Sequence, residues 1–273
     1  MLSPRILHRV SSLVERKVNV NNISLNIVEG GSGSKSVLLM PGLMGSIWSD
    51  FKHQVQQLPE LLPNHKIIAW DPPGYGKSTP PQRNWHVNSL HEDAELAVDL
   101  MRNLGRPKFS MVAWSSGAMT AIIAASRHQQ NVDKIVMWGG SAYLTQREIK
   151  SYKQSRDVSK WPVHMLEPME RIYGADKFPQ LWSEFVDAIC ALDSERGGDF
   201  CKDDLKNVTA PIFLLHGKRD FVKDPEHVHY FKQRLNVKRY HEFPEGKHNI
   251  HLRYPDEFNR LVADFLLDQS EKS

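Results

Sequence analysis

The sequence predicts an α/β fold in which a mostly parallel central sheet is flanked by helices and interrupted by a helical lid insertion. Short apolar segments alternate with stretches of helical spacing, which is typical of a parallel sheet covered on both faces. Several apolar segments end in glycine-containing loops, which suit close approach of the backbone to a neighbour. The alternation stops between residues 141 and 204 and then resumes, which indicates an insertion into one domain.

The first predicted strands cover residues 18–20 and 23–28 and are joined by the turn pair Asn21-Asn22. The next strand, residues 37–40, ends in the loop Pro41-Gly42-Leu43-Met44-Gly45-Ser46. Another strand, residues 66–70, runs into a turn-rich segment. A helix is then predicted over residues 88–104.

Residues 109–114 read as a buried strand, and residues 119–125 read as a helix. A strand that turns directly into a helix exposes the hydroxyl of Ser115 above the sheet, as in a nucleophile elbow. Ala113 stands where the G-x-S-x-G pattern has its first glycine, and Gly117 keeps the second. A plain helix N-cap formed by the two serines is the alternative for this stretch.

The remaining chain divides into the insertion, residues 141–204, and the second part of the core, residues 205–273. The core therefore comprises residues 18–140 and 205–273. Further strands are expected at residues 134–138, 211–215 and 238–243, and further helices at 145–156, 164–173, 177–192, 226–235 and 258–267.

Residues 1–17 form a basic leader in which no acid precedes Glu15. Apolar side chains recur there every fourth residue and would share one helical face: Leu2, Ile6, Val10 and Val14. This pattern predicts a mitochondrial presequence. A basic surface segment of a cytoplasmic protein is the alternative.

Composition excludes several classes of protein. The chain of 273 residues carries a net charge of +3, too small to indicate a nucleic-acid partner, and no apolar run is long enough to span a membrane. The 13 histidines form no metal-ligand motif, so no metal and no cofactor are expected. Cys190 and Cys201 are expected to be free thiols. We expect a monomer that acts on a small molecule.

Ser115, Asp220 and His248 each follow the carboxyl end of a predicted parallel strand, where ligands bind in open sheets. This combination suits nucleophilic catalysis, because the histidine takes the serine proton and the carboxylate orients the histidine. Asp224 and His251 are the rivals of Asp220 and His248, and Ser116 is the rival of Ser115, although its position suits a backbone donor. Asp220 is preferred because it lies closer to its strand, and His248 because it follows Gly246.

Two backbone N–H groups are expected to stabilise the oxyanion of the reaction. Ser116 N–H lies at a helix N-terminus, and Leu43 N–H lies in the glycine-containing loop after residue 40. Three tryptophans, Trp48, Trp161 and Trp182, are candidates to line the substrate pocket together with Ser116.

Several motifs together resemble the α/β-hydrolase superfamily over nearly the whole chain after residue 17. They are the Pro41-Gly42 loop, Asp71-x-x-Gly74-x-Gly76-x-Ser78, the Ser115 turn, His216-Gly217-x-x-Asp220 and Gly246-x-His248. Longer stretches resemble the valacyclovir hydrolase (biphenyl hydrolase-like) branch. They are Ala69-Trp70-Asp71-Pro72, Asp157-Val158-Ser159-Lys160-Trp161 and the segment 244–253, PEGKHNIHLR.

The resemblance implies a serine hydrolase of small carboxylic esters, including α-amino acid esters, in a mitochondrial setting. The branch has an acidic residue directly after its nucleophile, suited to an ammonium group, whereas this chain has the neutral Ser116. Glu184 or Asp187 in the lid is a candidate substitute. A C–C bond hydrolase of ring-fission diones and a non-catalytic binding module of the same fold are the alternative functions.

Overall fold

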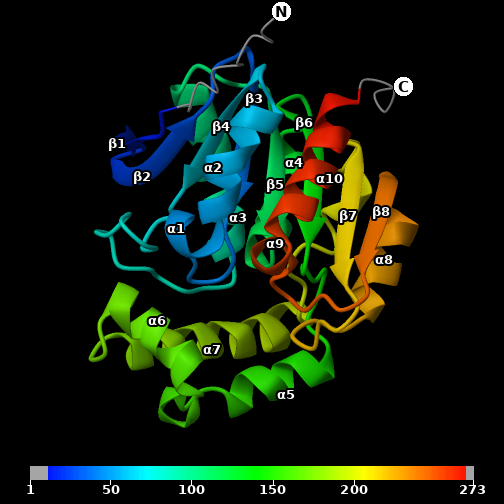
Figure 1. Cartoon of the computed structure of the whole chain (residues 1–273). Helices are drawn as coiled ribbons and strands as arrows, with labels where there is room; N and C mark the ends of the chain where they lie inside the picture. Colours follow the sequence, from blue (N-terminus) through cyan, green and yellow to red (C-terminus); the bar gives the residue numbers. More distant parts are fainter. Residues whose placement is uncertain (1–11, 269–273) are drawn as a thin grey trace, which may run out of the picture.

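The computed structural model describes residues 12–268, in which a single sheet is covered by helices on both faces (Figure 1). The order in the sheet is β1-β2-β4-β3-β5-β6-β7-β8. The pairings of β1 with β2 and of β2 with β4 are antiparallel, and the others are parallel, which confirms the predicted fold class. The strands are β1 (Val14–Val20), β2 (Ile23–Gly30), β3 (Lys35–Met40), β4 (His65–Trp70), β5 (Phe109–Trp114), β6 (Val132–Trp138), β7 (Ile212–Gly217) and β8 (Val237–Phe243).

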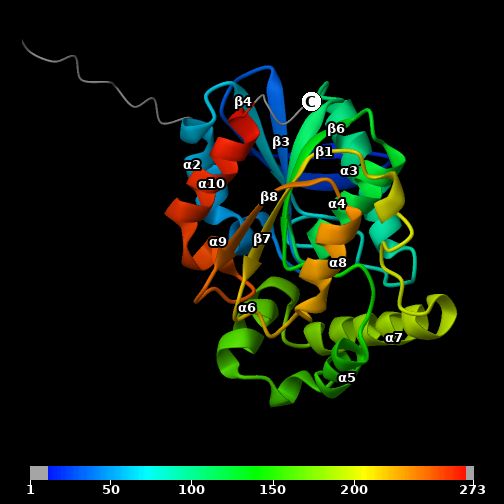
Figure 2. The same cartoon turned by 90° about the vertical axis from the view of Figure 1, so that its right-hand side faces the viewer.

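Helices α2 and α10 lie on one face of the sheet, and α3, α4 and α8 lie on the other (Figure 2). The apolar core accordingly divides into two clusters, one on each face. No helix within residues 12–268 has the length and apolar character needed to cross a membrane. The helices of the core are α1 (Ile47–Asp50), α2 (Lys52–Leu61), α3 (Ser89–Asn103), α4 (Ser116–Arg127), η2 (Leu205–Asn207), α8 (Glu226–Arg234), α9 (Ile250–Arg253) and α10 (Pro255–Leu267).

The N-terminal hairpin begins earlier than predicted. Strand β1 starts at Val14 and so includes the last four residues assigned to the leader; residues 1–11 lie outside the described part. Only Val18 and Val20 of this edge strand are buried, which is why the apolar pattern revealed just its end. The turn pair Asn21-Asn22 has positive φ at both residues, as a tight hairpin turn requires.

Helix α2 was missing from the sequence prediction. Its buried face is nonetheless visible in the sequence as an apolar series at helical spacing: Phe51, Val55, Leu58 and Leu62. The polar residues between them and Pro59 inside the helix obscure this series. The helix packs against α10 and against strands β2 and β4 of the sheet.

The insertion between β6 and β7 is helical, as predicted, and we call its helices α5–α7 the cap. It consists of α5 (Gln146–Gln154), η1 (Val158–Lys160), α6 (Val163–Tyr173) and α7 (Phe178–Arg196). The cap lies below the sheet in Figure 1, at the end where β3, β5, β6 and β7 finish. It therefore covers the edge to which the loops after the parallel strands lead.

Helix α4 packs unusually close to β3 at Gly117. A Cβ atom at Gly117 would lie 2.4 Å from the carbonyl oxygen of Met40 and 2.5 Å from that of Pro41. Backbone atoms cannot give way as a flexible side chain can. The second glycine of the predicted elbow is therefore required by packing.

We predict that Gly117→Ala lowers the free energy of unfolding by about 3 kcal/mol, because the added methyl group overlaps two carbonyl oxygens. Gly197→Ala is the matched control: Gly197 has φ 59° and open space around its Cα, so only the strain of about 1 kcal/mol is expected. Urea denaturation of both variants measures the difference. Equal decreases in the free energy of unfolding for the two variants would show that the close contact at Gly117 does not contribute to stability.

Candidate active site

Ser115 occupies the turn between β5 and α4. Its backbone has φ 55° and ψ −119°, a conformation that non-glycine residues rarely adopt. Two hydrogen bonds hold the turn, from Ser115 N to Trp138 O at 3.0 Å and from Ala118 N to Ser115 O at 3.0 Å. The hydroxyl reaches the wall of a cavity between the sheet and the cap.

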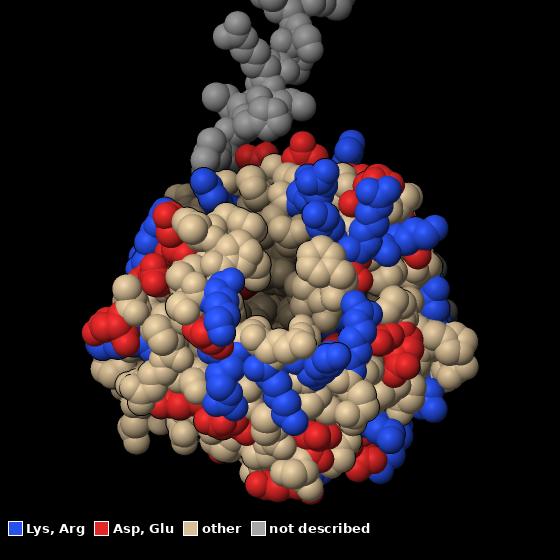
Figure 3. All heavy atoms as spheres, turned by 90° about the horizontal axis from the view of Figure 1, so that it is seen from below, with Lys and Arg blue, Asp and Glu red and all other residues tan. Residues whose placement is uncertain are grey.

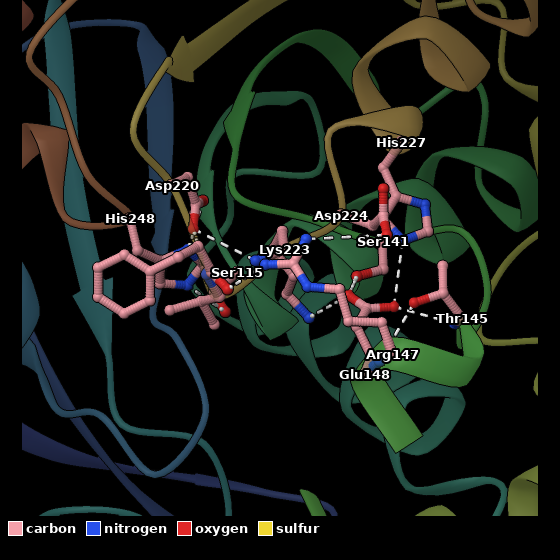
Figure 4. Close-up of polar contacts among 12 residues, drawn as sticks. Ser115, Ser141, Thr145, Arg147, Glu148, Asp220, Lys223, Asp224, His227 and His248 are labelled. Carbon is pink, nitrogen blue, oxygen red and sulfur yellow. Dashed lines mark hydrogen bonds and ion pairs between the residues drawn. The ribbon is translucent and has the colours of Figure 1, made fainter. Parts of the chain in front are cut away.

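Ser115, His248 and Asp220 are brought together by three separate loops (Figure 4). His248 Nε2 lies 3.1 Å from Ser115 Oγ, and His248 Nδ1 lies 2.7 Å from Asp220 Oδ2. Both distances are within the range of hydrogen bonds. The three side chains form a continuous hydrogen-bonded chain from the buried carboxylate to the hydroxyl in the cavity.

Asp220 is held as an ionised group. Its Oδ1 accepts hydrogen bonds from the backbone N–H of Val222 at 2.8 Å and of Lys223 at 3.2 Å. Burial alone would raise the pKa of Asp220, but the hydrogen bond and charge of His248, with the two backbone donors, lower it below its ordinary value. A carboxylate in this state fixes the proton of His248 on Nδ1 and leaves Nε2 facing the hydroxyl.

The rival residues lie elsewhere. His251 is fully buried, and its Nδ1 accepts a hydrogen bond from Trp138 Nε1 at 3.2 Å. Its ring packs on Trp114 and Trp138 with centroid distances of 4.5 and 4.8 Å, so it is a core residue. Asp224 lies 3.8 Å from Arg147 Nη1 and accepts from the backbone of Glu226 at 3.2 Å, away from His248.

The loop after β3 and the start of α4 border the cavity beside Ser115. Leu43 and Ser116 are both in the cavity wall. Ser116 N–H is in the first turn of α4, where N–H groups have no partner within the helix. Leu43 N–H donates no hydrogen bond to another residue of the described chain. Two donors are therefore available next to the hydroxyl of Ser115.

The side chain of Asp50 holds the loop after β3 by hydrogen bonds. Its Oδ2 accepts a hydrogen bond from Gly42 N at 2.9 Å, and its Oδ1 accepts from Ser49 Oγ at 2.6 Å. The loop wraps tightly around the carboxyl group, since a Cβ at Gly45 would lie 1.8 Å from Asp50 Oδ2. Burial raises the pKa of Asp50 to about 7 and outweighs these hydrogen bonds. Nothing in the sequence pattern indicated this residue.

The cavity has a volume of about 260 Å³ and a mostly apolar wall. Trp161 and Trp182 line it as predicted; both indole N–H groups donate to the carbonyl of Ser155 at 2.9 Å. Trp48 was predicted wrongly to lie here. It is at the surface, where its Nε1 lies 3.3 Å from Glu15, because α1 turns that side chain outward.

Other residues of the wall were not anticipated. Trp114 directly precedes Ser115, and its Nε1 donates to the carbonyl of His248 at 3.0 Å, which ties two of the loops together. Lys223 is the third residue after Asp220 and also borders the cavity. The remaining unanticipated part of the wall is mainly apolar: Trp85, Leu90, Met119, Met169, Phe178, Phe185, Ile189, Leu192, Phe200 and Val222.

The acidic residues considered as ammonium partners do not reach this cavity. Glu184 and Asp187 border a second hollow, between α7 and residues 85–87, together with Glu195. Asp187 Oδ1 is bound to Arg156 Nη2 at 2.6 Å, and Glu184 Oε1 to Gln180 Nε2 at 2.8 Å. Within residues 12–268 the cavity wall contains no Asp or Glu.

Within the described ranges, His, Cys, Asp and Glu side chains form no group of three or more suited to a metal ion. Cys190 and Cys201 are free thiols, as predicted, and Cys201 is buried.

Comparisons with known proteins agree on the type of protein. Residues 37–261 match the model of the "Alpha/beta hydrolase family". The human protein "Serine hydrolase BPHL" is 39% identical over 94% of this chain and 87% of its own length, and the mouse protein of that name is equally similar. A dienoic acid hydrolase of Metapseudomonas resinovorans, 2-hydroxy-6-oxo-6-(2'-aminophenyl)hexa-2,4-dienoic acid hydrolase, is 23% identical over 94% and 92% of the two chains.

Solved structures show the same fold at low identity. The structure of 2-hydroxy-6-oxo-6-phenylhexa-2,4-dienoate hydrolase from Rhodococcus sp. strain RHA1 superposes with a TM-score of 0.77 at 14% identity. The match covers 94% of this chain and all of that chain. A putative lipase from Acinetobacter baumannii gives a TM-score of 0.78 at 20% identity over 93% and 91% of the two chains.

The carboxyl group of Asp50 yields a prediction on stability. Its pKa of about 7 lies above the ordinary 3.8, so between pH 4 and 7 the folded state keeps a proton that the unfolded state releases. This contribution therefore lowers stability as pH rises, by about 1.4 kcal/mol per unit and about 4 kcal/mol in total. Above pH 7 the loss is complete.

Asparagine has the shape of aspartic acid but does not ionise. We therefore predict that Asp50→Asn removes the loss of folding stability between pH 4 and 7. The variant should match the wild type near pH 4 and exceed it by about 4 kcal/mol at pH 8. Urea denaturation at both pH values measures the gap. Stability curves that run parallel from pH 4 to 8 would contradict the raised pKa.

Proposed function

Because the chain belongs to the alpha/beta hydrolase family and resembles serine hydrolases at 39% identity, we propose that it cleaves small carboxylic esters through a Ser115 acyl-enzyme. The observation that carries the proposal is the hydrogen-bonded chain from Ser115 through His248 to Asp220. A hydroxyl needs such a base before it becomes an effective nucleophile.

In the proposed mechanism, Ser115 Oγ attacks the ester carbonyl as His248 Nε2 takes its proton. Asp220 stabilises the imidazolium that results. The N–H groups of Leu43 and Ser116 stabilise the negative charge on the carbonyl oxygen. His248 returns the proton to the departing alcohol, and a water molecule, activated by the same histidine, releases the acid from Ser115.

The proposed substrates are small esters with an apolar part, since aromatic and aliphatic side chains form most of the cavity wall. Amino acid esters are not part of the proposal. Ser116 is neutral, and the described cavity wall has no carboxylate that would bind an ammonium group. Glu184 and Asp187 supply none, because neither of them lines this cavity.

A C–C bond hydrolase of ring-fission diones is the second candidate. Its support is the 23% identity to the dienoic acid hydrolase of Metapseudomonas resinovorans, over 94% of this chain. The same hydroxyl, imidazole and carboxylate would serve that reaction. Ester hydrolysis is preferred because the similarity to serine hydrolase BPHL is much higher. A non-catalytic module has no use for the intact hydrogen-bonded chain.

We predict that the protein hydrolyses p-nitrophenyl butyrate with a burst of p-nitrophenol, since this good leaving group makes acylation of Ser115 faster than hydrolysis of the acyl-enzyme. Ser115→Ala and Asp220→Asn should each lower kcat by about 1,000-fold or more. Asp224→Asn is the matched control and should leave kcat unchanged, because Asp224 does not contact His248. Turnover that survives Ser115→Ala would refute the proposed nucleophile. Absence of turnover in the folded wild type would favour the dione hydrolase.

A further inference from the structure

We infer that Lys223 gives the cavity a preference for substrates that carry a carboxylate, which the Lys223 ammonium group binds. This inference concerns the substrate of Ser115 and so rests on the proposed function. It names a chemical class, an ester with a negatively charged group on its acyl chain. It also assigns a role to a residue that the reaction itself does not use.

Lys223 is a cation built into the wall of the cavity. Its side chain is 6% exposed and borders the same space as Ser115 and His248. Its position is fixed by the loop after β7, because the backbone N–H of Lys223 donates to Asp220 Oδ1 at 3.2 Å. Figure 4 shows Lys223 between two sets of polar side chains. One set is Ser115, His248 and Asp220, and the other includes Glu148 of α5 and His227 of α8.

The carboxylate nearest to Lys223 is engaged by other donors. Glu148 Oε1 accepts from Ser141 Oγ at 3.0 Å, and Oε2 accepts from Thr145 N at 3.0 Å and contacts His227 Nε2 at 3.2 Å. Lys223 Nζ lies 3.7 Å from Glu148 Oε1, which is too long for a hydrogen bond. Glu148 therefore offers attraction to the ammonium group without occupying its donors.

Both groups are charged. Burial alone would raise the pKa of Glu148, but the hydrogen bond of His227 and the charge of Lys223 lower it to about 2. Burial alone would lower the pKa of Lys223, yet its neighbours, led by Tyr152 and Glu148, raise it above the ordinary value. The raised pKa keeps the Lys223 ammonium group charged at neutral pH, where a carboxylate substrate is ionised.

The rest of the described cavity wall does not neutralise this charge. It contains no Asp or Glu, and its other polar side chains carry hydroxyl, indole or imidazole groups. Tyr152 borders the cavity beside Lys223, and its hydroxyl oxygen accepts a hydrogen bond from the ammonium group. A carboxylate placed there gains a charge-assisted hydrogen bond, whereas an ammonium group meets a like charge in an apolar setting.

Positively charged side chains border the opening on the outer surface. Figure 3 shows Lys and Arg side chains gathered around the hollow on the cap face of the molecule. Arg147 and Lys247 both contact Phe221, the neighbour of the cavity residue Val222. Arg147 Nη2 donates to Phe221 O at 2.9 Å, and Lys247 Nζ lies 5.8 Å from the Phe221 ring. Such a rim favours the approach of anions.

The test compares three p-nitrophenyl esters of similar length: the mono-ester of adipic acid, its methyl ester, and the ester of 6-aminohexanoic acid. They place a negative, a neutral and a positive group at the same end of the acyl chain. We expect the wild type to favour the adipate over the aminohexanoate by at least about 10-fold in kcat/KM, mainly through KM.

Lys223→Met should lower kcat/KM for the adipate by about 10- to 100-fold more than it lowers kcat/KM for the methyl ester. Lys223→Arg should retain most of the preference. Lys108→Met, which removes an exposed lysine far from the cavity, is the control for total charge and should change nothing. Equal losses on all three esters would assign Lys223 a purely structural role and overturn the inference.

A separate binding experiment distinguishes failure of this inference from failure of the proposed function. Hexanoate and hexylammonium are titrated against the wild type, with tryptophan fluorescence as the signal from the cavity wall. Hydrolysis of the methyl ester without any charge preference overturns the inference and leaves the esterase. Tighter binding of hexanoate, lost in Lys223→Met, without hydrolysis of any ester, refutes the esterase and supports the anion site. Equal binding of both ions without hydrolysis refutes both.

Discussion

The backbone turn at Ser115 is the constraint on which the rest of the active-site region depends. A non-glycine residue at φ 55° and ψ −119° is strained, and it persists only where the surrounding structure holds it. Here α4 must lie so close to β3 that Gly117 leaves no room for a side chain. The same close approach brings the loop after Met40 beside the N-terminus of α4. One turn therefore places the hydroxyl and both candidate oxyanion donors.

Two buried carboxyl groups, Asp50 and Asp71, stabilise the loops around that turn. Asp71 accepts from Ile47 N at 2.8 Å and from Lys77 N at 2.9 Å, and a Cβ at Gly76 would lie 2.6 Å from its Oδ2. The Asp71 carboxyl group therefore holds the turn by its hydrogen bonds, and Gly76 is needed because a larger residue would overlap that carboxyl group. The motif that spans residues 71–78 has a structural role: it satisfies backbone donors that burial would otherwise leave without partners.

Much of the fold and the positions of Ser115, Asp220 and His248 could be predicted, because the local sequence pattern and the topology of the parallel sheet indicate the same arrangement. Ser115, Asp220 and His248 each lie in the turn or loop that follows a parallel strand, and the carboxyl ends of parallel strands meet at one edge of the sheet. The failures have physical causes. Trp48 was misplaced because spacing does not reveal which way a short helix turns a side chain. Lys223 and Asp50 were missed because burial of a single charged residue has no sequence pattern.

The cap is attached to the core unevenly. At α5 the buried Glu148 joins Lys223 and His227, and separating such groups leaves charges without partners in an apolar setting. Helix α6 has no buried residue; its link to the core includes a hydrogen bond from Tyr173 Oη to Met44 O at 2.8 Å. Local opening requires least free energy where little apolar surface is buried. Local opening of the cap is therefore expected to begin at α6 rather than at α5.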